Sequence, residues 1–212
     1  MKIVHLDDVA PGHPDGPAWL PLRSVLGIRA FGVSAYRADA GETVVPRHDE
    51  RPGGGAGAHE ELYVVLSGRA AFAVEGETLD APAGTCVLVL PEEAREARAE
   101  EPGTIVLAVG APVGEPYRIA PWEYGSRATR AAELGDVDEL ERVAEEGVAA
   151  YGEHVTMLLA KACVAAQRGR RDEALSLIAR AVDDDDFGDW ARERAREEPL
   201  LDPVRDDPSF PR

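Results

Sequence analysis

The stretch HEELYVVLSGRAAFAVEGETLDAPAGTCVLVLP, residues 59–91, decides the fold class of the first half of the chain. Its short apolar runs are separated by SGR, EGE and PAG, which supply Gly and Pro for tight turns. Similar runs lie before and after it, so we expect strands over residues 28–36, 43–45, 62–66, 70–74, 85–90 and 104–109. Short strands at such regular intervals are typical of a β-sandwich or β-barrel.

The pattern changes across the turn-rich segment APVGEPYRIAPWEYG, residues 111–125. Beyond it the apolar residues follow helical spacing, as Val155, Leu158, Leu159, Ala162 and Ala166 do. We therefore expect a β-barrel domain over residues 1–111, a linker over 112–126 and a small all-α domain over 127–212.

An internal repeat runs through the helical half. AELGDVDELERVAEEG (132–147) aligns with AQRGRRDEALSLIARA (166–181), so that Gly135 pairs with Gly169 and Asp138 with Asp172. The spacing is 34 residues, the period of tetratricopeptide repeats, and the segment resembles such a repeat. We expect packed helices over 136–150, 155–168 and 172–183, with Gly169 in a positive-φ turn. The resemblance implies a surface for a protein partner.

Two short motifs make residues 28–110 resemble a cupin. Glu61 is followed after six residues by Gly68, and Pro82-Ala83-Gly84 leads into the next strand. The resemblance implies a double-stranded β-helix, and cupins hold a transition metal with three His and one Glu. Their activities include those of oxygenases, isomerases, lyases and binding proteins, so the fold alone does not fix the function.

The family's metal ligands are incomplete in this sequence. Gly55, Ala56 and Gly57 stand where the family has two His separated by one residue, and Arg95 stands where it has its last His. Arginine has no free lone pair for a metal. A reduced set of His48, His59 and Glu61 would suit iron, zinc, manganese or nickel if the three converge. We expect His48, flanked by charged residues, to be a surface side chain.

A carboxylate inside a barrel needs a cation or a proton. If Glu61 points inward, His59 and Tyr63 share its face because they lie two residues away on either side. We predict that Arg95 points inward and pairs with Glu61, which would make a metal unnecessary. The expected ligand pocket is therefore lined by His59, Glu61, Tyr63 and Arg95, with no cofactor. In the other use of this geometry, Arg95 binds a small anionic ligand that His59 and Tyr63 orient.

Composition limits the function classes. The formal charge of −17 excludes nucleic acid and anionic membranes as favoured partners, because both require a basic surface. No apolar run approaches bilayer length and the first residues do not form a leader, so we expect a cytoplasmic protein.

Three functions are consistent with these observations. The first is a degenerate cupin that binds a small molecule and offers its helical module to a protein partner. The second is a metal-dependent cupin enzyme with a reduced His/Glu ligand set. The third is a purely architectural role in which the chain forms a homodimer, since cupins commonly dimerise through their sheets.

Overall fold

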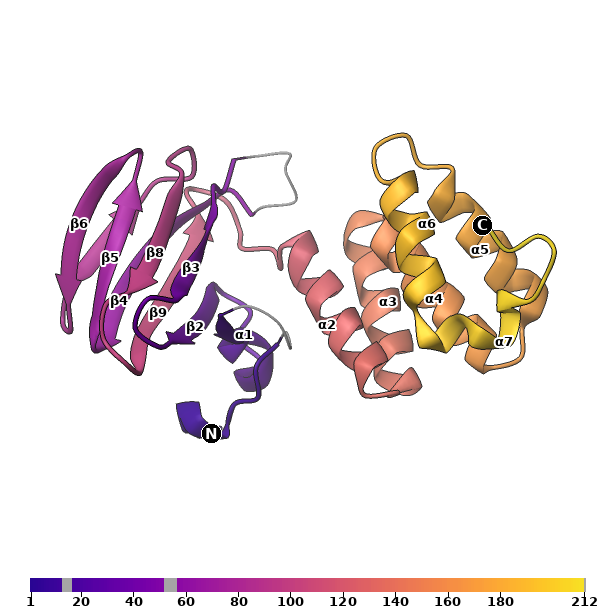
Figure 1. Ribbon diagram of the computed structural model, residues 1–212, viewed down its shortest axis with the longest axis horizontal. Coiled ribbons are helices and arrows are strands. Elements are labelled where there is room, and N and C mark those ends of the chain that lie inside the picture. The colour runs from indigo at the N-terminus through magenta and orange to yellow at the C-terminus, as the bar shows by residue number, and fades with distance from the viewer. Residues whose placement is uncertain (13–16, 52–56, 212) are drawn as a thin grey trace. The chain divides into compact units, whose positions relative to one another are not determined.

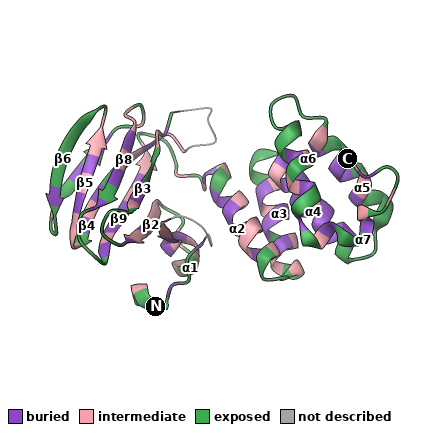
Figure 2. Ribbon diagram, viewed as in Figure 1, coloured by how far each residue is buried: buried purple, intermediate pink, exposed green. Residues whose placement is uncertain are grey.

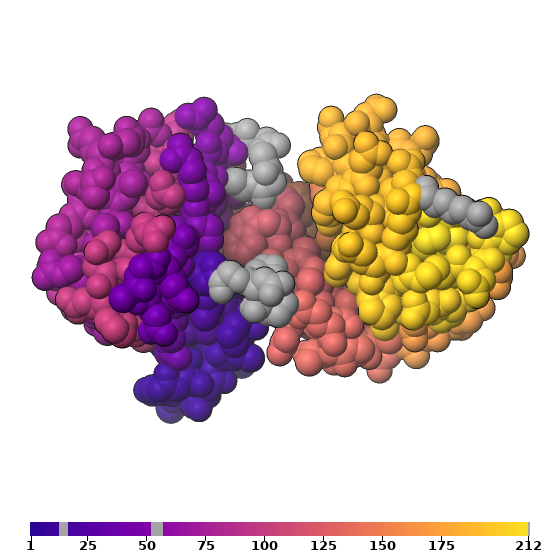
Figure 3. Space-filling view, viewed as in Figure 1, coloured from indigo at the N-terminus to yellow at the C-terminus, as the bar shows by residue number. Residues whose placement is uncertain are grey.

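The computed structural model describes residues 1–12, 17–51 and 57–211. The chain forms two compact units, Met1–Ala120 and Pro121–Arg212, which are separated by colour in Figures 1 and 3. Among the described residues, no helix combines the length and the apolar character needed to cross a bilayer. Helix α2 (Pro121–Glu133) occupies residues 121–126, which we had assigned to the linker.

The first unit consists of two antiparallel sheets. One has the strand order β1 (Ala18–Leu20), β2 (Gly32–Ala38), β9 (Thr104–Pro112), β4 (His59–Ser67) and β7 (Cys86–Val89). The other, labelled in Figure 1, has the order β3 (Thr43–His48), β8 (Arg95–Ala99), β5 (Arg69–Val74) and β6 (Glu77–Pro82). Neighbours in each sheet are mostly distant in sequence, as in the double-sheet jelly rolls to which cupins belong. The predicted cupin-like β fold of the first half is confirmed.

The strands alternate between a buried and an exposed face, as Figure 2 shows. On β4 the side chains of Tyr63 and Val65 are buried, while Leu62 and Leu66 are exposed. The inward residues of both sheets form one apolar cluster, which includes Phe72 of β5. Period-two alternation with one face in the core fixes the register of each strand, because a shift by one residue would expose the buried set.

Strand β8 has an unusual inward face. Arg95, Ala97 and Ala99 are fully buried, and Glu96 and Arg98 lie on the other face. Its sequence REARA contains no large apolar residue, so the apolar runs did not indicate it. Strands β1 and β6 also lie outside the predicted runs.

A second, smaller apolar cluster covers part of the outer face of the first sheet. It contains Val9, Leu20 and Leu22, which come from the segment before β2 and include the start of the short helix α1 (Leu22–Leu26). Ile105 and Leu107 of β9 pack against it. The N-terminal segment, which begins with a 3₁₀ helix at Leu6–Asp8, therefore covers β2 and β9 on their outer side.

The second unit is entirely helical. Its elements are α2, α3 (Val137–Tyr151), α4 (Val155–Gln167), α5 (Arg171–Val182), α6 (Gly188–Glu197), a 3₁₀ turn (Pro199–Leu201) and α7 (Asp202–Arg205). The three predicted helices are confirmed as α3, α4 and α5. Each helix from α2 to α6 packs on the next, and α4 also contacts α2 and α6.

The helix starts repeat with the period seen in the sequence. Helix α4 begins 34 residues after α2, at Val155 and Pro121, and α5 begins 34 residues after α3, at Arg171 and Val137. The turn before α3 and the turn before α5 both contain a glycine in the left-handed region, Gly135 at φ +65° and the predicted Gly169 at φ +75°.

Substitution of Leu158 tests the packing of α4. Leu158 is buried at 5% exposure, so Leu158→Asp places an unpaired carboxylate in the helical core and should lower the unfolding free energy by about 3 kcal/mol or more. The same substitution at Leu134, which is 63% exposed, is the matched control and should cost little. Urea unfolding followed by helical circular dichroism measures both, and equal stability of the two variants would contradict the packing.

Candidate functional site

The candidate site lies between the two sheets and is centred on the carboxylate of Glu61. Glu61 and Tyr63 share the inner face of β4, and the Tyr63 hydroxyl donates a 2.5 Å hydrogen bond to Oε2 of Glu61. Gly110 of β9 is the register partner of Glu61. A Cβ at position 110 would lie 2.9 Å from Cγ of Glu61, so glycine leaves the room that this side chain occupies.

Arg95 reaches Glu61 from the opposite sheet. Its side chain has no solvent exposure, and its Nη2 donates to Oε2 of Glu61 at 2.5 Å. The other two nitrogens also donate, Nε to the Tyr63 hydroxyl at 3.3 Å and Nη1 to the Glu93 carbonyl at 3.0 Å. The predicted placement of Arg95 beside Glu61 is confirmed.

His48 belongs to the same site, so our expectation of a surface side chain was wrong. Strand β3 lies next to β8, and its register places His48 opposite Arg95. The carbonyl of Pro46 lies 2.7 Å from Nδ1, which must carry the proton because a carbonyl only accepts. Nε2 therefore faces Glu61, 3.6 Å from Oε2. The His48 side chain is 30% exposed, which makes it the group of this set that meets solvent most.

His59 is buried beside a different carboxylate. Its Nδ1 lies 3.7 Å from Oε2 of Glu50, which also accepts a 2.7 Å hydrogen bond from the Gly57 amide. The imidazole stacks on Tyr117 with 5.5 Å between ring centroids. Its Nε2 is buried and has no hydrogen-bond partner among the described residues. Residues 52–56 of the Gly-rich stretch lie outside the described part of the chain.

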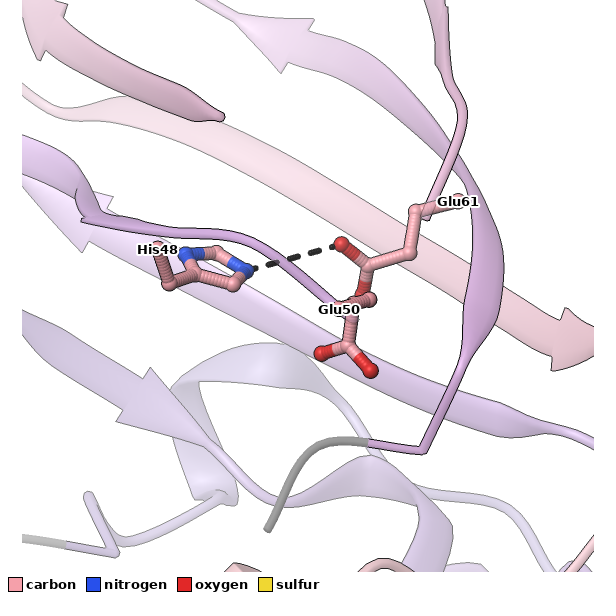
Figure 4. Close-up of side chains that lie close together, drawn as sticks. All are labelled: His48, Glu50 and Glu61. Atoms are coloured by element: carbon pink, nitrogen blue, oxygen red, sulfur yellow. Dashed lines mark ion pairs between the residues drawn. The ribbon is translucent and has the colours of Figure 1, made fainter. Parts of the chain in front are cut away.

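Among the described residues, the side chains that could share a metal are His48, Glu50 and Glu61. One ligand atom from each lies within 4.8 Å of the other two, and Figure 4 shows the two carboxylates and the imidazole facing one another. The set that we expected, His48, His59 and Glu61, is therefore corrected, with Glu50 in place of His59. His59 is directed to Glu50 instead, with its Nδ1 3.7 Å from Oε2 of that residue.

The electrostatics keep Glu61 ionised. Burial raises its pKa, but the interactions with His48, Tyr63 and Arg95 outweigh burial and lower the pKa to about 2. Burial lowers the pKa of His48, yet Glu61 and the Pro46 carbonyl raise it above its usual value. Burial and the Glu61 carboxylate raise the pKa of Tyr36 on β2 and of Tyr63, so both phenols stay protonated. The pair of Glu61 and Arg95 is thus charged at neutral pH.

The two oxygens of the Glu61 carboxylate differ in their contacts. Its hydrogen bonds and ion pairs with described residues all involve Oε2. Oε1 accepts no hydrogen bond from a described residue, whereas Nε2 of His48 lies against Oε2 and Glu50 accepts from the Gly57 amide. By donor type these atoms suit a divalent transition metal. The guanidinium of Arg95 opposes one, because its charge already lies against the same carboxylate.

Sequence reasoning missed Glu50 and Tyr36. Glu50 lies two residues after His48, so the pattern His-X-Glu signals two side chains on one face at the end of β3. The family's motif has His-X-His rather than His-X-Glu, so the resemblance did not indicate Glu50. Tyr36 was within a predicted strand, and its neighbours Ala35 and Arg37 did not indicate a site.

The comparisons with known proteins concern the first unit. No protein-family model matches the chain, and no curated protein matches it. Among solved structures, a cupin protein from Bacteroides fragilis is similar at 21% identity and a TM-score of 0.41, over 57% of this chain and 90% of that chain. An RmlC-like cupin protein from Desulfovibrio desulfuricans is 21% identical over 53% and 97% of the two chains, with a TM-score of 0.43. A Klebsiella pneumoniae protein with a double-stranded β-helix domain is 20% identical over 57% and 97%, also at 0.43.

The lowered pKa of Glu61 predicts a pH-dependent contribution to stability. Because its folded pKa of about 2 lies below the ordinary 4.5, the contribution is complete above pH 4.5 and is lost as the pH falls towards 2. The difference in unfolding free energy between the wild type and Glu61→Gln should therefore shrink by about 3 kcal/mol across that interval. Urea unfolding at a series of pH values measures it. Glu60→Gln, on the outer face of β4, is the control, and a constant Glu61→Gln difference would contradict the ion pair.

Proposed function

We propose that the first unit is a small-molecule-binding barrel in which Arg95 takes the place of a metal ion. The observation that carries this proposal is the fully buried guanidinium with Nη2 2.5 Å from Glu61. A buried charge is stable only if it is paired, and here the pair is complete without a cation. The cluster is therefore a preorganised polar surface rather than an open metal centre.

The ligand of this barrel is a small molecule that donates hydrogen bonds or carries a positive charge. Support comes from the two carboxylates of the site. The contacts of Glu61 with described residues all involve Oε2, which leaves Oε1 as an acceptor, and Glu50 offers a second carboxylate beside it. Each nitrogen of the Arg95 guanidinium already donates one hydrogen bond within the protein, to Glu61, Tyr63 or Glu93. An acidic ligand would also face two carboxylates, which makes the anionic alternative of the sequence analysis the weaker one.

The second candidate is a metal-dependent enzyme of the oxygenase, isomerase or lyase type. The specific observation in its favour is that ligand atoms of His48, Glu50 and Glu61 lie within 4.8 Å of one another. These residues would hold the ion, which would supply Lewis-acid or redox chemistry. Tyr63 and Arg95 would keep Glu61 ionised and oriented in that case, since both donate to its Oε2.

Metal analysis separates the two candidates. We expect the freshly purified wild type to contain less than stoichiometric iron, zinc, manganese and nickel, and chelation to leave its melting temperature unchanged. Arg95→His removes the opposing charge and adds an imidazole, so this variant should gain stoichiometric zinc. Arg98→His, on the exposed face of the same strand, is the matched control. Stoichiometric metal in the wild type would reject the metal-free barrel in favour of the enzyme.

We further propose that the helical unit is a tetratricopeptide-like module that binds a protein partner. The 34-residue offset between helix starts supports it, as does a repeated surface position. Trp122, Thr156 and Trp190 follow one another at that interval near the starts of α2, α4 and α6. Both indoles are more than 40% exposed, and exposed Trp is frequent at binding hot spots.

A cytoplasmic location remains a prediction of the sequence.

The two tryptophans provide a test of this module. The double variant Trp122→Ser, Trp190→Ser should lose a partner that co-purifies stoichiometrically with the wild type, with affinity falling at least about tenfold. Helical circular dichroism should stay unchanged, since both positions are largely exposed. Phe187→Ser, at a 49% exposed aromatic residue before α6, is the control. Equal capture by the wild type and the double variant would contradict this surface.

A further inference from the structure

The face of the helical unit that displays Trp122 and Trp190 has carboxylates beside one of its indoles. The loop between α5 and α6 contains four aspartates, residues 183–186, and leads into the first turn of α6, which holds Trp190. All four aspartates are exposed, and Figure 2 shows this loop in green. An indole and several carboxylates therefore occupy adjoining exposed positions, so this face has an apolar part and an anionic part.

One of the four aspartates shapes the loop. Oδ1 of Asp184 accepts hydrogen bonds from the amides of Asp186 at 3.1 Å and Phe187 at 2.9 Å. Asp183 is the C-cap of α5, where a carboxylate is unfavourable because the helix carbonyls make this end negative. Within the described part of the chain, Asp183, Asp185 and Asp186 form no ion pair. The protein therefore does not compensate these three charges.

The nearest arginines in sequence are already paired. Arg180, in the last turn of α5, pairs with Glu153, and Arg192 of α6 pairs with Asp189. The loop is also not a metal site, because among the described residues the acidic and imidazole groups converge closely enough for an ion only in the barrel. The loop therefore offers its charge to a cationic group of another molecule.

We propose that the partner of the helical unit presents a segment rich in arginine and lysine, which lies along the loop 183–186 and over Trp190. This inference rests on the proposed protein-binding role and adds the chemistry of the partner. A guanidinium suits both parts of the face, since it binds carboxylates through two hydrogen bonds and stacks on an indole. The Phe187 ring packs on the His154 imidazole, with 5.9 Å between centroids, so we assign the aromatic contact to Trp190.

Other occupants fit this face less well. An acidic segment or a nucleic acid would be repelled by the uncompensated carboxylates. An apolar segment would bury them without a partner, which is costly for a charged group. A second copy of the chain would bring another net charge of −17. A basic segment is favoured because it gains from the carboxylates and from the indole together.

Binding of a defined peptide to the full chain tests the proposal. The probe is a fluorescein-labelled octapeptide of alternating arginine and alanine, and fluorescence anisotropy measures its affinity. We expect saturable binding to the wild type, and none of a matching octapeptide of alternating glutamate and alanine. The loop variant, Asp183→Asn with Asp185→Asn and Asp186→Asn, should bind at least about tenfold more weakly because three ion pairs are lost. Its melting temperature should not fall, since these residues form no ion pair with the described residues.

A matched control removes three charges elsewhere. The substitutions are at exposed carboxylates of the helical unit that form no ion pair with a described residue: Glu145→Gln, Asp172→Asn and Asp206→Asn. This control variant should bind the arginine peptide within about twofold of the wild type. Trp190→Leu keeps an apolar side chain but removes the ring, and it should weaken binding about threefold.

Three outcomes would overturn the proposal. They are no binding of the arginine peptide, equal binding of the glutamate peptide, and equal weakening by the loop variant and the control variant. The last would show a general attraction to an acidic protein. A failure of the protein-binding role itself gives a different result. If the double tryptophan variant loses the co-purifying partner and the loop variant keeps it, only the basic chemistry is wrong. If both variants keep the partner, the binding surface is wrong.

Discussion

A positive charge enclosed between two β-sheets has to be matched by a negative one, and the arrangement of the barrel interior depends on this requirement. Arg95 comes from the sheet of β3, β8, β5 and β6, and Glu61 comes from the opposite sheet. The pair therefore joins the two sheets beside the apolar cluster of the interior. Such a pair adds little stability over a well-packed apolar core, but loss of one partner is costly because the other remains buried and charged.

The ion pair also determines which groups remain open for chemistry. Glu61 receives Arg95 and Tyr63 on a single oxygen, so the carboxylate is held ionised and in one orientation. His48 lies 3.6 Å from the same oxygen and is the most solvent-exposed member of the group, and Glu50 lies nearby. The charges of Arg95 and Glu61 are therefore buried at the inner end of the site, and the titratable imidazole of His48 lies nearer to solvent.

The sequence predicted those features that depend on local periodicity. Apolar runs located six strands, and helical spacing with the 34-residue offset located α3, α4 and α5. Strand β8 could not be found in that way, because its inward residues are two alanines and an arginine. Arg95 itself was placed only by analogy with the family's last histidine.

The failures in the site have a common physical cause. His48 and Glu50 are separated from Glu61 by a Gly-rich stretch of unusual length, so their distance from Glu61 in sequence did not indicate their distance in space. The pairing of β3 with β8 brings His48 to the site, and pairing between distant strands is not encoded in a local pattern. His59 shows the converse. It shares a strand face with Glu61, but its contact is with Glu50.

The close contacts around Gly110 restrict which residues can stand at positions 61 and 110 in related sequences. The missing side chain of this glycine leaves the volume that Cγ of Glu61 fills, and a Cβ at position 110 would also lie 3.2 Å from the Glu60 carbonyl oxygen and 3.2 Å from Cβ of His59. Positions 61 and 110 therefore share one volume across β4 and β9. Among homologous sequences the two should vary together, with glycine kept at 110 wherever a long acidic residue stands at 61, and larger residues tolerated at 110 only where position 61 is shortened.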